Sequence, residues 1–343
     1  MLLNLLIRHL LRFGFFHNYC FNYYFIRSAL TVFVYHDVSD DPSEFSKTYG
    51  LNVPPELFDN QISFIKNNFN VISPDDLLKL RIPPKAALIT FDDGLKSFFK
   101  NAIPILERHG VPVIIFLNME PIMGELFWSG LITYLCQKNE DFVRFLKERS
   151  RLPQSSKPLY LHCSREITES YLQSSGKQLE GFKDEIDKFV GEFATEEDLA
   201  QAAKKQNVFF GNHLFNHHVP VLMSDEALVE SYSKNRDALK EYPNCRDMFS
   251  FPFGQPKTCF TDDQIKLLLR NGAEKVFSGY PLINSDATSP YLHRVALTSY
   301  NNSPSKIWFP IFLPSFRLRF GVMDPYLDGK ALTRFRKLRK EQV

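Results

Sequence analysis

Two adjacent carboxylates follow an apolar run in the stretch ALITFDDG, residues 87–94. A short, uninterrupted apolar run predicts a buried strand, so Asp92 and Asp93 would stand at its carboxyl end. Buried carboxylates repel one another unless a cation or a shared proton lies between them. A simpler interpretation is a turn in which both acids cap a helix that begins near Leu95. The pair alone leaves both interpretations open.

The stretch GNHLFNHHV, residues 211–219, supplies a partner for the acids. His213 and His217 have H-x3-H spacing at the end of another predicted strand, so both imidazoles can converge on one ion across a turn. Taken alone, they could equally be hydrogen-bonded structural histidines. Two strand ends that both supply ligand-type residues predict a metal site with two histidines and one aspartate. Three protein ligands leave an open position, which is typical of a catalytic metal, and the second aspartate would accept a proton from water.

These residues need a scaffold that brings strand ends together. The chain has 343 residues, of which 44% are hydrophobic, so it can bury a sizeable core. Short apolar runs alternate with helical patterns, which predicts an α/β fold: an irregular (β/α) barrel of about seven parallel strands. The predicted strands are 30–36, 86–91, 111–117, 207–213, 247–253, 274–278 and 294–298; the predicted helices are 57–68, 95–109, 225–240 and 261–271.

The domain organisation follows from breaks in this alternation. We expect an amphipathic N-terminal segment at 1–28, a barrel at 29–320 and a basic C-terminal tail at 321–343. Residues 120–205 carry two long helical patterns and a third that begins with a capping box at Thr195 and Asp198. We interpret this region as a helical insertion after a strand, above the face where barrel loops build active sites.

The location of the protein is predicted from the N-terminus and the cysteines. Arg8 and Arg12 interrupt the first apolar run, and no clear cleavable signal peptide follows. The segment would lie on an anionic membrane or pack on its own domain. The five cysteines form no CxxC or other close pair, which argues against a disulfide framework and favours a reducing compartment. We expect a cytoplasmic protein, peripheral on the inner membrane, although an uncleaved export signal is an alternative.

The partners of the protein are limited by its charge. The net charge is +2, and the sequence has no basic stripe interleaved with aromatic residues. We therefore expect no nucleic-acid partner.

Three motifs in this order resemble those of a known family: TFDDG (90–94), HLFNH (213–217) and FPFG (251–254). They are similar to the metal and substrate motifs of the polysaccharide deacetylases, the NodB-homology or carbohydrate esterase 4 group. VYHDVSDD at 34–41 and FW at 127–128 further resemble members from exopolysaccharide clusters. The resemblance spans about residues 30–300. It implies a NodB-like barrel that removes N-acetyl groups from amino sugars of a surface polysaccharide or its lipid-linked precursor.

The resemblance also assigns roles to matching residues. Asp92 matches the catalytic base, and the family's metal triad falls on Asp93, His213 and His217. The metal would be divalent, usually Zn²⁺, with Co²⁺ or Ni²⁺ as alternatives. The partner would be an N-acetylated glycan, with one wall of the sugar groove formed by Pro252, Phe253 and Gly254.

The sequence departs from the family pattern in two places. Many members carry an arginine two residues before the motif proline, where this chain has Ser250; Arg246 lies six before it, and Arg294 is a candidate replacement and substrate contact. The late Leu-x-His motif, which provides a general acid, is not clearly present. His293 is a candidate acid, and His36, at the end of the first predicted strand, is a candidate for supporting the site or contacting substrate.

Two other functions remain open at this point. Removal of a formyl or other small acyl group would use the same motifs. A non-catalytic glycan-binding protein that keeps the fold would account for the missing arginine and the unclear acid. A purely structural metal site leaves the second carboxylate unexplained.

Overall fold

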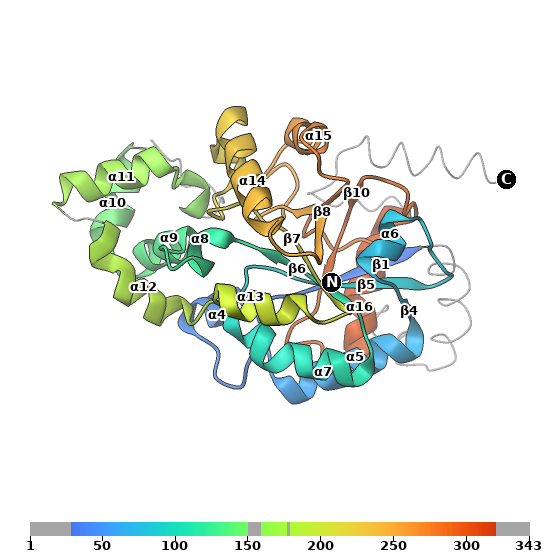
Figure 1. Ribbon diagram of the computed structural model, residues 1–343. Helices are drawn as coiled ribbons and strands as arrows, with labels where there is room; N and C mark the ends of the chain where they lie inside the picture. The colour runs from blue at the N-terminus through green and yellow to red at the C-terminus, as the bar shows by residue number, and fades with distance from the viewer. Residues whose placement is uncertain (1–28, 150–158, 177–178, 320–343) are drawn as a thin grey trace.

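The centre of the molecule is a curled parallel sheet with helices packed around it (Figure 1). The computed structural model describes residues 29–149, 159–176 and 179–319. The order along the sheet is β10-β9-β8-β7-β6-β5-β1-β11, with β4 also paired to β5. The strands are β1 (Leu30–Tyr35), β4 (Asn70–Val71), β5 (Ala86–Phe91), β6 (Val113–Leu117), β7 (Val208–Asn212), β8 (Cys245–Ser250), β9 (Lys275–Phe277), β10 (Tyr291–Leu292) and β11 (Val295–Ala296), beside a small separate sheet of β2 (Asp37–Val38) and β3 (Asn52–Val53).

This sheet confirms the predicted irregular barrel. Each of the seven predicted strands is present, and every pairing in the sheet is parallel. β4 and β10 were missed because two residues are too few to show a period. The predicted strand at 294–298 is reduced to Val295–Ala296, and β8 starts two residues earlier than predicted.

One short segment pairs with both edges of the sheet. Tyr291 and Leu292 pair with β9, and only two residues later Val295 and Ala296 pair with β1. We call residues 291–296 the closing segment. It brings the last part of the barrel to its first strand, and its middle residues, His293 and Arg294, lie where the two edges meet.

The apolar strands are buried on both faces, as their uninterrupted hydrophobic runs predict. All six residues of β1 and all six of β5 are buried. Because side chains alternate along a strand, Phe33 faces the cluster shared with the outer helices, while Val32 faces a second cluster drawn from strands around the sheet. The burial of these two faces fixes the register of the strands and therefore where their carboxyl ends lie.

The outer helices follow the predicted pattern with one correction. Phe58, Ile62 and Ile65 of the 57–68 pattern are all fully buried. The predicted helix at 95–109 is interrupted by a π-turn, η2 (Phe98–Ala102), before it ends with Gly110 as a left-handed C-cap. The helices around the barrel are α4 (Glu44–Tyr49), α5 (Pro55–Asn68), α6 (Pro74–Leu78), α7 (Ile103–His109), α8 (Met119–Ile122), α13 (Glu196–Ala203), α14 (Asp225–Leu239), α15 (Asp262–Arg270) and α16 (Pro304–Arg319), with η5 (Pro220–Leu222).

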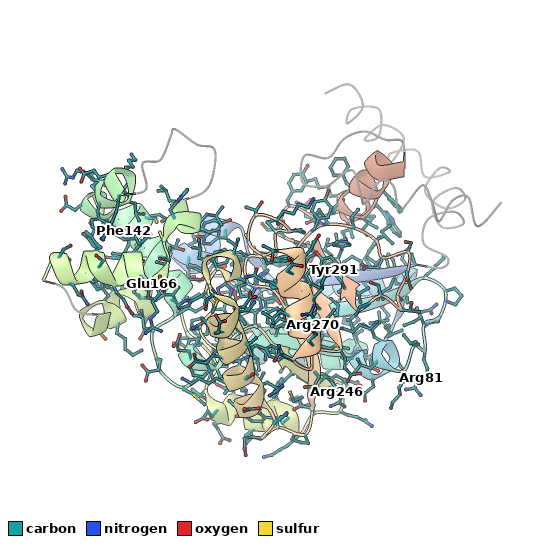
Figure 2. All side chains as sticks on the ribbon, turned by 90° about the horizontal axis from the view of Figure 1, so that it is seen from above. Arg81, Phe142, Glu166, Arg246, Arg270 and Tyr291 are labelled. Atoms are coloured by element: carbon teal, nitrogen blue, oxygen red, sulfur yellow. The ribbon has the colours of Figure 1, made fainter. Side chains whose placement is uncertain are left out.

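A helical lobe projects to one side of the sheet (Figure 1). It has its own hydrophobic cluster around residues such as Phe142, which is fully buried and labelled within the lobe in Figure 2. The lobe elements are α9 (Trp128–Lys138), α10 (Glu140–Arg149), η3 (Leu159–His162), α11 (Arg165–Ser174), η4 (Leu179–Phe182) and α12 (Lys183–Val190). The two long helices predicted here are each broken into shorter ones. In the first, Asn139 ends one helix and caps the next; the second is divided into α11, η4 and α12.

The third predicted helix of this region belongs with the barrel. The capping box of Thr195 and Asp198 is present at the start of α13. Leu199 and Ala202 of that helix pack in the cluster shared by the sheet and the outer helices. The expectations for residues 1–28 and 321–343 lie outside the described residues. Within the described residues, no helix is long and apolar enough to cross a membrane.

Candidate active site

The predicted acids and histidines meet at the carboxyl ends of β5 and β7. Asp92 and Asp93 directly follow β5, and His213 directly follows β7. Nε2 of His213 lies 3.5 Å from Oδ1 of Asp93, and Nε2 of His217 lies 3.3 Å from the same oxygen. One ligand atom from each of these three buried residues lies within 4.8 Å of the other two. The structure therefore brings together the residues proposed as metal ligands.

Hydrogen bonds at the far side of both rings orient the free nitrogens toward Asp93. Nδ1 of His213 donates to the carbonyl oxygen of Ser250 at 2.7 Å. Since a carbonyl can only accept, Nε2 of His213 carries the lone pair. Nδ1 of His217 contacts the Ser129 hydroxyl at 2.5 Å, and that hydroxyl also lies 3.2 Å from the backbone carbonyl of His217. This arrangement suits two neutral imidazoles that bind a cation through Nε2, with their outer nitrogens held by the protein.

The backbone around the cluster is held in an uncommon conformation. Asp93, Leu214 and His217 have positive φ angles of 75°, 63° and 51°. Such angles are unfavourable for residues other than glycine and persist only where surrounding contacts enforce them. Two buried asparagines supply part of this enforcement: Asn118 donates to the carbonyls of His213 and Leu214, and Asn212 accepts from the Leu214 N–H.

A buried asparagine on α14 supports the same turn. The Asn235 amide nitrogen donates to the Leu117 carbonyl at 2.8 Å and to Oδ1 of Asn212 at 2.9 Å. Its oxygen accepts from the Met119 N–H at 2.9 Å. Asn235 therefore links the carboxyl ends of β6 and β7, next to the turn that carries the two histidines.

The second acid, Asp92, is held by an arginine. The guanidinium of Arg294 makes two parallel hydrogen bonds to the Asp92 carboxylate, at 2.7 Å and 2.6 Å. Both side chains are almost fully buried, with 2% and 3% exposed. Burial raises the pKa of Asp92, but Arg294 and His213 more than offset this, so its net pKa lies below the ordinary value. Asp92 is therefore an ionised carboxylate at neutral pH.

Arg294 itself is fixed from three sides. Its Nε donates to the Ser278 carbonyl at 3.2 Å, and Nη1 also donates to the Thr90 hydroxyl at 3.3 Å. The position predicted from the family pattern contains Ser250, whose hydroxyl is 3.5 Å from Asp92. Arg246 is bound elsewhere, in a pair with Asp75 at the other end of β8, and Figure 2 labels it on the barrel. Arg294 was a candidate substrate contact, but its side chain is buried and its guanidinium binds Asp92.

An aromatic wall borders the candidate metal ligands Asp93, His213 and His217. The rings of Phe253 and Phe127 each lie 5.2 Å from that of His217. Tyr160, from η3 of the lobe, stacks on Phe253 at 4.6 Å between ring centroids. Sequence reasoning missed Tyr160 and Ser129, because neither lies in a recognisable motif. The lobe therefore contributes side chains to the surroundings of the site.

The third motif is shaped by close backbone packing. Pro252 is buried, and Phe253 has a positive φ of 60°. A Cβ on Gly254 would lie 2.6 Å from the Gly279 backbone nitrogen, so only glycine fits. This packing turns the Phe253 ring toward His217.

The two remaining histidines lie differently with respect to the base. Nε2 of His36 lies 3.8 Å from the Asp92 carboxylate, and its side chain is 23% exposed. His293 instead contacts the Ser278 hydroxyl through Nδ1 at 2.8 Å and lies between the rings of Tyr280 and Tyr291. Burial lowers the pKa of His293 to about 4. His36 is thus the histidine that faces both the base and solvent.

The curled parallel sheet and the buried acid and histidine cluster at its carboxyl-terminal edge define the class of the protein as a NodB-like (β/α) barrel. The family model described as Polysaccharide deacetylase matches residues 79–133, which include Asp92 and Asp93. Over these residues the chain is similar to the polysaccharide deacetylases.

Comparison with an individual protein shows the same similarity. The YxkH protein of Bacillus subtilis (strain 168), which carries a provisional polysaccharide deacetylase name, is 28% identical over 96 residues. This match covers 26% of the chain and about a third (32%) of the relative's length.

Solved structures show the same fold over most of the chain. IcaB from Ammonifex degensii covers 82% of this chain and 97% of its own, with a TM-score of 0.54 and 18% identity. The Streptococcus pyogenes deacetylase PplD, solved in complex with acetate, covers 83% and 99%, with a TM-score of 0.55 and 17% identity. A de-N-acetylase from Aggregatibacter actinomycetemcomitans covers 82% and 100%, with a TM-score of 0.54 and 17% identity. At these identities, the likeness shows the fold.

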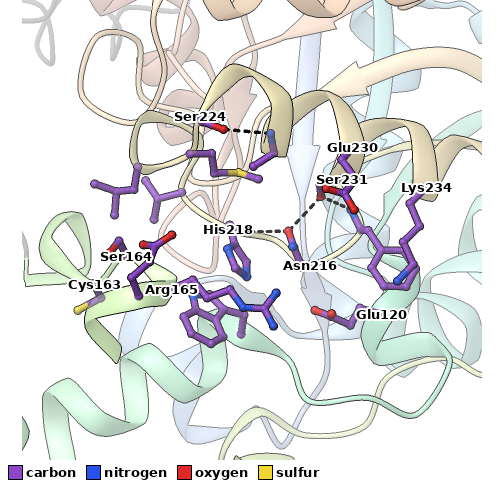
Figure 3. Close-up of a pocket in the computed structure, with 17 residues that line it drawn as sticks. Glu120, Cys163, Ser164, Arg165, Asn216, His218, Ser224, Glu230, Ser231 and Lys234 are labelled. Atoms are coloured by element: carbon purple, nitrogen blue, oxygen red, sulfur yellow. Dashed lines mark hydrogen bonds between the residues drawn. The ribbon is translucent and has the colours of Figure 1, made fainter. Parts of the chain in front are cut away.

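A separate cavity of about 260 Å³ lies between the lobe and α14 (Figure 3). Trp128 and His218 stack beside it at 4.7 Å, and burial lowers the pKa of His218 to about 3. His218 therefore packs as a neutral ring and does not join the candidate ligands Asp93, His213 and His217. Figure 3 shows Glu120 and Lys234 near one end of the cavity and Ser224 near the other.

Glu120 in this cavity makes stability dependent on pH. Burial raises its pKa from 4.5 to about 7, although Arg165 and Lys234 act in the opposite direction. The folded state therefore holds the proton more firmly than the unfolded state, and stability falls as pH rises between these values. Glu120→Gln should unfold at higher urea concentration than the wild type at pH 8, by about 1 kcal/mol after allowance for solvent screening, and this advantage should shrink at pH 5.

Urea unfolding of both proteins at the two pH values, at one metal concentration, measures this difference. Glu148→Gln is the control, because its side chain is exposed and it is not among the groups that shift the pKa of Glu120. An equal advantage of Glu120→Gln at pH 5 and pH 8 would contradict the prediction.

Proposed function

We propose that the protein is a metal-dependent hydrolase that removes N-acetyl groups from amino sugars of a surface polysaccharide or its lipid-linked precursor. The observation that carries this proposal is the division of two adjacent carboxylates. Asp93 faces two histidine nitrogens, while Asp92 is bound by Arg294 and stays outside that cluster. One acid is placed to bind a cation and the other to accept a proton.

The metal would be held by Asp93, His213 and His217. The fit is supported by their buried, converging ligand atoms and by the outer hydrogen bonds that leave both Nε2 atoms free. The nitrogen and oxygen donor set suits Zn²⁺ best, with Co²⁺ and Ni²⁺ as alternatives. When bound, such a metal polarises the amide carbonyl and makes water a stronger acid.

The residues of this chain supply the proton transfer and the orientation. Asp92 would take the proton of the attacking water, because it is ionised and lies beside the cluster. Arg294 would hold both oxygens of that carboxylate in one plane and keep them ionised. Phe253, with Tyr160 stacked behind it, would give the sugar ring an apolar face beside the reacting amide.

The leaving amine requires a proton donor, and the geometry favours His36 over His293. His36 is partly exposed and 3.8 Å from Asp92, whereas His293 is held by Ser278 and has a pKa lowered to about 4. A group that is neutral at working pH in this way is a poor acid. We therefore assign the acid to His36.

Substitution of the two histidines separates these roles. His36→Gln should lower kcat about 10²-fold with little change in bound metal, because the loss is confined to proton donation. His293→Gln should retain most of kcat. Steady-state kinetics with metal content measured in each preparation decides between them, and the reverse order of effects would return the role to His293.

The Arg294 contact also weighs against a binding-only protein. That alternative was motivated by the missing motif arginine, and a different arginine binds the base here. Contact of residues 1–28 with the inner membrane surface, and a cytoplasmic location, remain part of the proposal.

Release of acetate from N-acetylhexosamine oligomers tests the proposal. Purified protein should release acetate, lose this activity with a chelator and regain it with Zn²⁺, and the Asp92→Asn variant should be inactive. Release of formate from N-formyl sugars instead would assign the deformylase alternative. Glycan binding without release of any acyl product in the metal-loaded protein would reject the hydrolase.

A further inference from the structure

Two cysteines of the lobe lie in contact. Cys136 is near the end of α9, and Cys163 directly follows η3. Their Sγ atoms are 3.9 Å apart although the residues are separated by 27 positions in sequence. Cys163 is buried and Cys136 is half-buried, so one thiol of the pair is open to a reagent. The spacing in sequence gave no sign of this proximity.

The pair joins two elements that each reach the candidate active site. α9 carries Ser129, whose hydroxyl contacts Nδ1 of His217. η3 carries Tyr160, which stacks on Phe253. Figure 3 shows Cys163 beside the cavity between the lobe and the barrel. A disulfide between the cysteines would therefore link α9, whose Ser129 holds His217, to η3, whose Tyr160 stacks on Phe253.

We propose that Cys136 and Cys163 are a modification site at which a reversible disulfide ties η3 to α9. A disulfide bond is about 2 Å long, so the two side chains must turn to bring the sulfur atoms about 2 Å closer. In a reducing compartment the pair stays as two thiols, and the link forms when a disulfide oxidant is present.

The reaction is a thiol–disulfide exchange with a small disulfide such as oxidised glutathione. The Cys136 thiolate attacks one sulfur of the oxidant, forms a mixed disulfide and releases one thiol. The Cys163 thiolate then attacks Sγ of Cys136, forms the protein disulfide and releases the second thiol. The two protein thiols lose two protons and two electrons, and the oxidant is reduced to two thiols.

The order of these steps follows from the surroundings of each sulfur. The contact with Cys136 raises the pKa of the Cys163 thiol, and burial raises it further. Cys163 is therefore the poorer first nucleophile and the natural second one.

Treatment of the purified full chain with oxidised glutathione tests the proposal. The wild type should lose the mass of two hydrogen atoms, and a peptide map without reductant should show one peptide that links Cys136 to Cys163. Dithiothreitol should reverse the change. Cys20 lies outside the described residues, so the peptide map, and not the mass alone, decides.

Serine variants provide the controls. Cys136→Ser and Cys163→Ser should each prevent the link, whereas Cys245→Ser and Cys259→Ser, which change the two other described cysteines, should form it as the wild type does. The proposal is overturned if the wild type keeps both thiols free, stops at glutathione adducts or pairs either cysteine with a different one. Because the decisive result is obtained on the wild type, a folding defect in a variant does not obscure it, and neither outcome depends on the proposed hydrolase activity.

Discussion

Replacement of Asp92 by asparagine is expected to lower kcat about 10³-fold while a divalent metal remains bound. The amide is close in size to the carboxylate but cannot accept a proton from water at neutral pH. The three candidate ligands, Asp93, His213 and His217, are unchanged by this substitution, so the metal should stay. Acetate release and metal analysis on the same preparation measure the two effects together.

A ligand variant provides the contrast. His213→Ala should lose both the metal and the activity, because it removes one of three ligands and leaves the Ser250 carbonyl without its donor. If Asp92→Asn loses as much metal as His213→Ala, then Asp92 is itself a metal ligand. Turnover near the wild-type rate in Asp92→Asn would reject its role as base.

Replacement of Arg294 by methionine should destabilise the protein by about 3–5 kcal/mol, because it leaves a buried carboxylate without its partner. The substitution removes both hydrogen bonds to Asp92 as well as those to Ser278 and Thr90. Urea unfolding at pH 7 measures this loss. Arg246→Met is the matched control, since it breaks a two-bond pair with Asp75 that is partly exposed, and it should cost about 1 kcal/mol.

The same variant should change the pH dependence of activity. In the wild type, Arg294 holds the pKa of Asp92 below its ordinary value, so the stability it contributes is present above that ordinary value and is lost as pH falls through the lowered one. Without Arg294, burial raises the pKa of Asp92 and only His213 and His36 act against it. The base is then protonated at higher pH, and the acid side of the kcat/KM profile should move upward.

The pH profile separates a positioning role for Arg294 from a structural one. A merely structural residue would lower kcat/KM equally at each pH, and Arg246→Met should leave the profile in place. An unmoved acid side in folded Arg294→Met would contradict the assignment. In Arg294→Lys, the acid side of the kcat/KM profile should lie between those of the wild type and Arg294→Met. Lysine restores the positive charge but cannot make the two parallel hydrogen bonds.

Sequence reasoning predicted the parts of the site that depend on local pattern. The apolar runs before Asp92 and His213 predicted strands, and parallel strands place their carboxyl ends at one edge. The H-x3-H spacing predicted that two rings converge, and the structure brings them to Asp93. These features follow from periodicity and spacing within a few residues.

The contacts that were missed depend on tertiary structure. Arg294 and Asp92 are 202 positions apart, and their pairing depends on a strand of two residues that shows no period. Ser129 and Tyr160 reach the site only because the lobe folds back on the barrel. The π-turn at 98–102 interrupts a sequence that has an ordinary helical pattern.

The closing segment makes the assembly of the site dependent on the order of synthesis. All three candidate metal ligands are present in the chain once residue 217 has been made, but the partner of Asp92 arrives only with Arg294. Because a domain generally folds as a unit, a growing chain that has not yet reached Arg294 would lack the group that keeps Asp92 ionised, even though all three ligands have been made. Competence for the reaction would then wait for the closing segment.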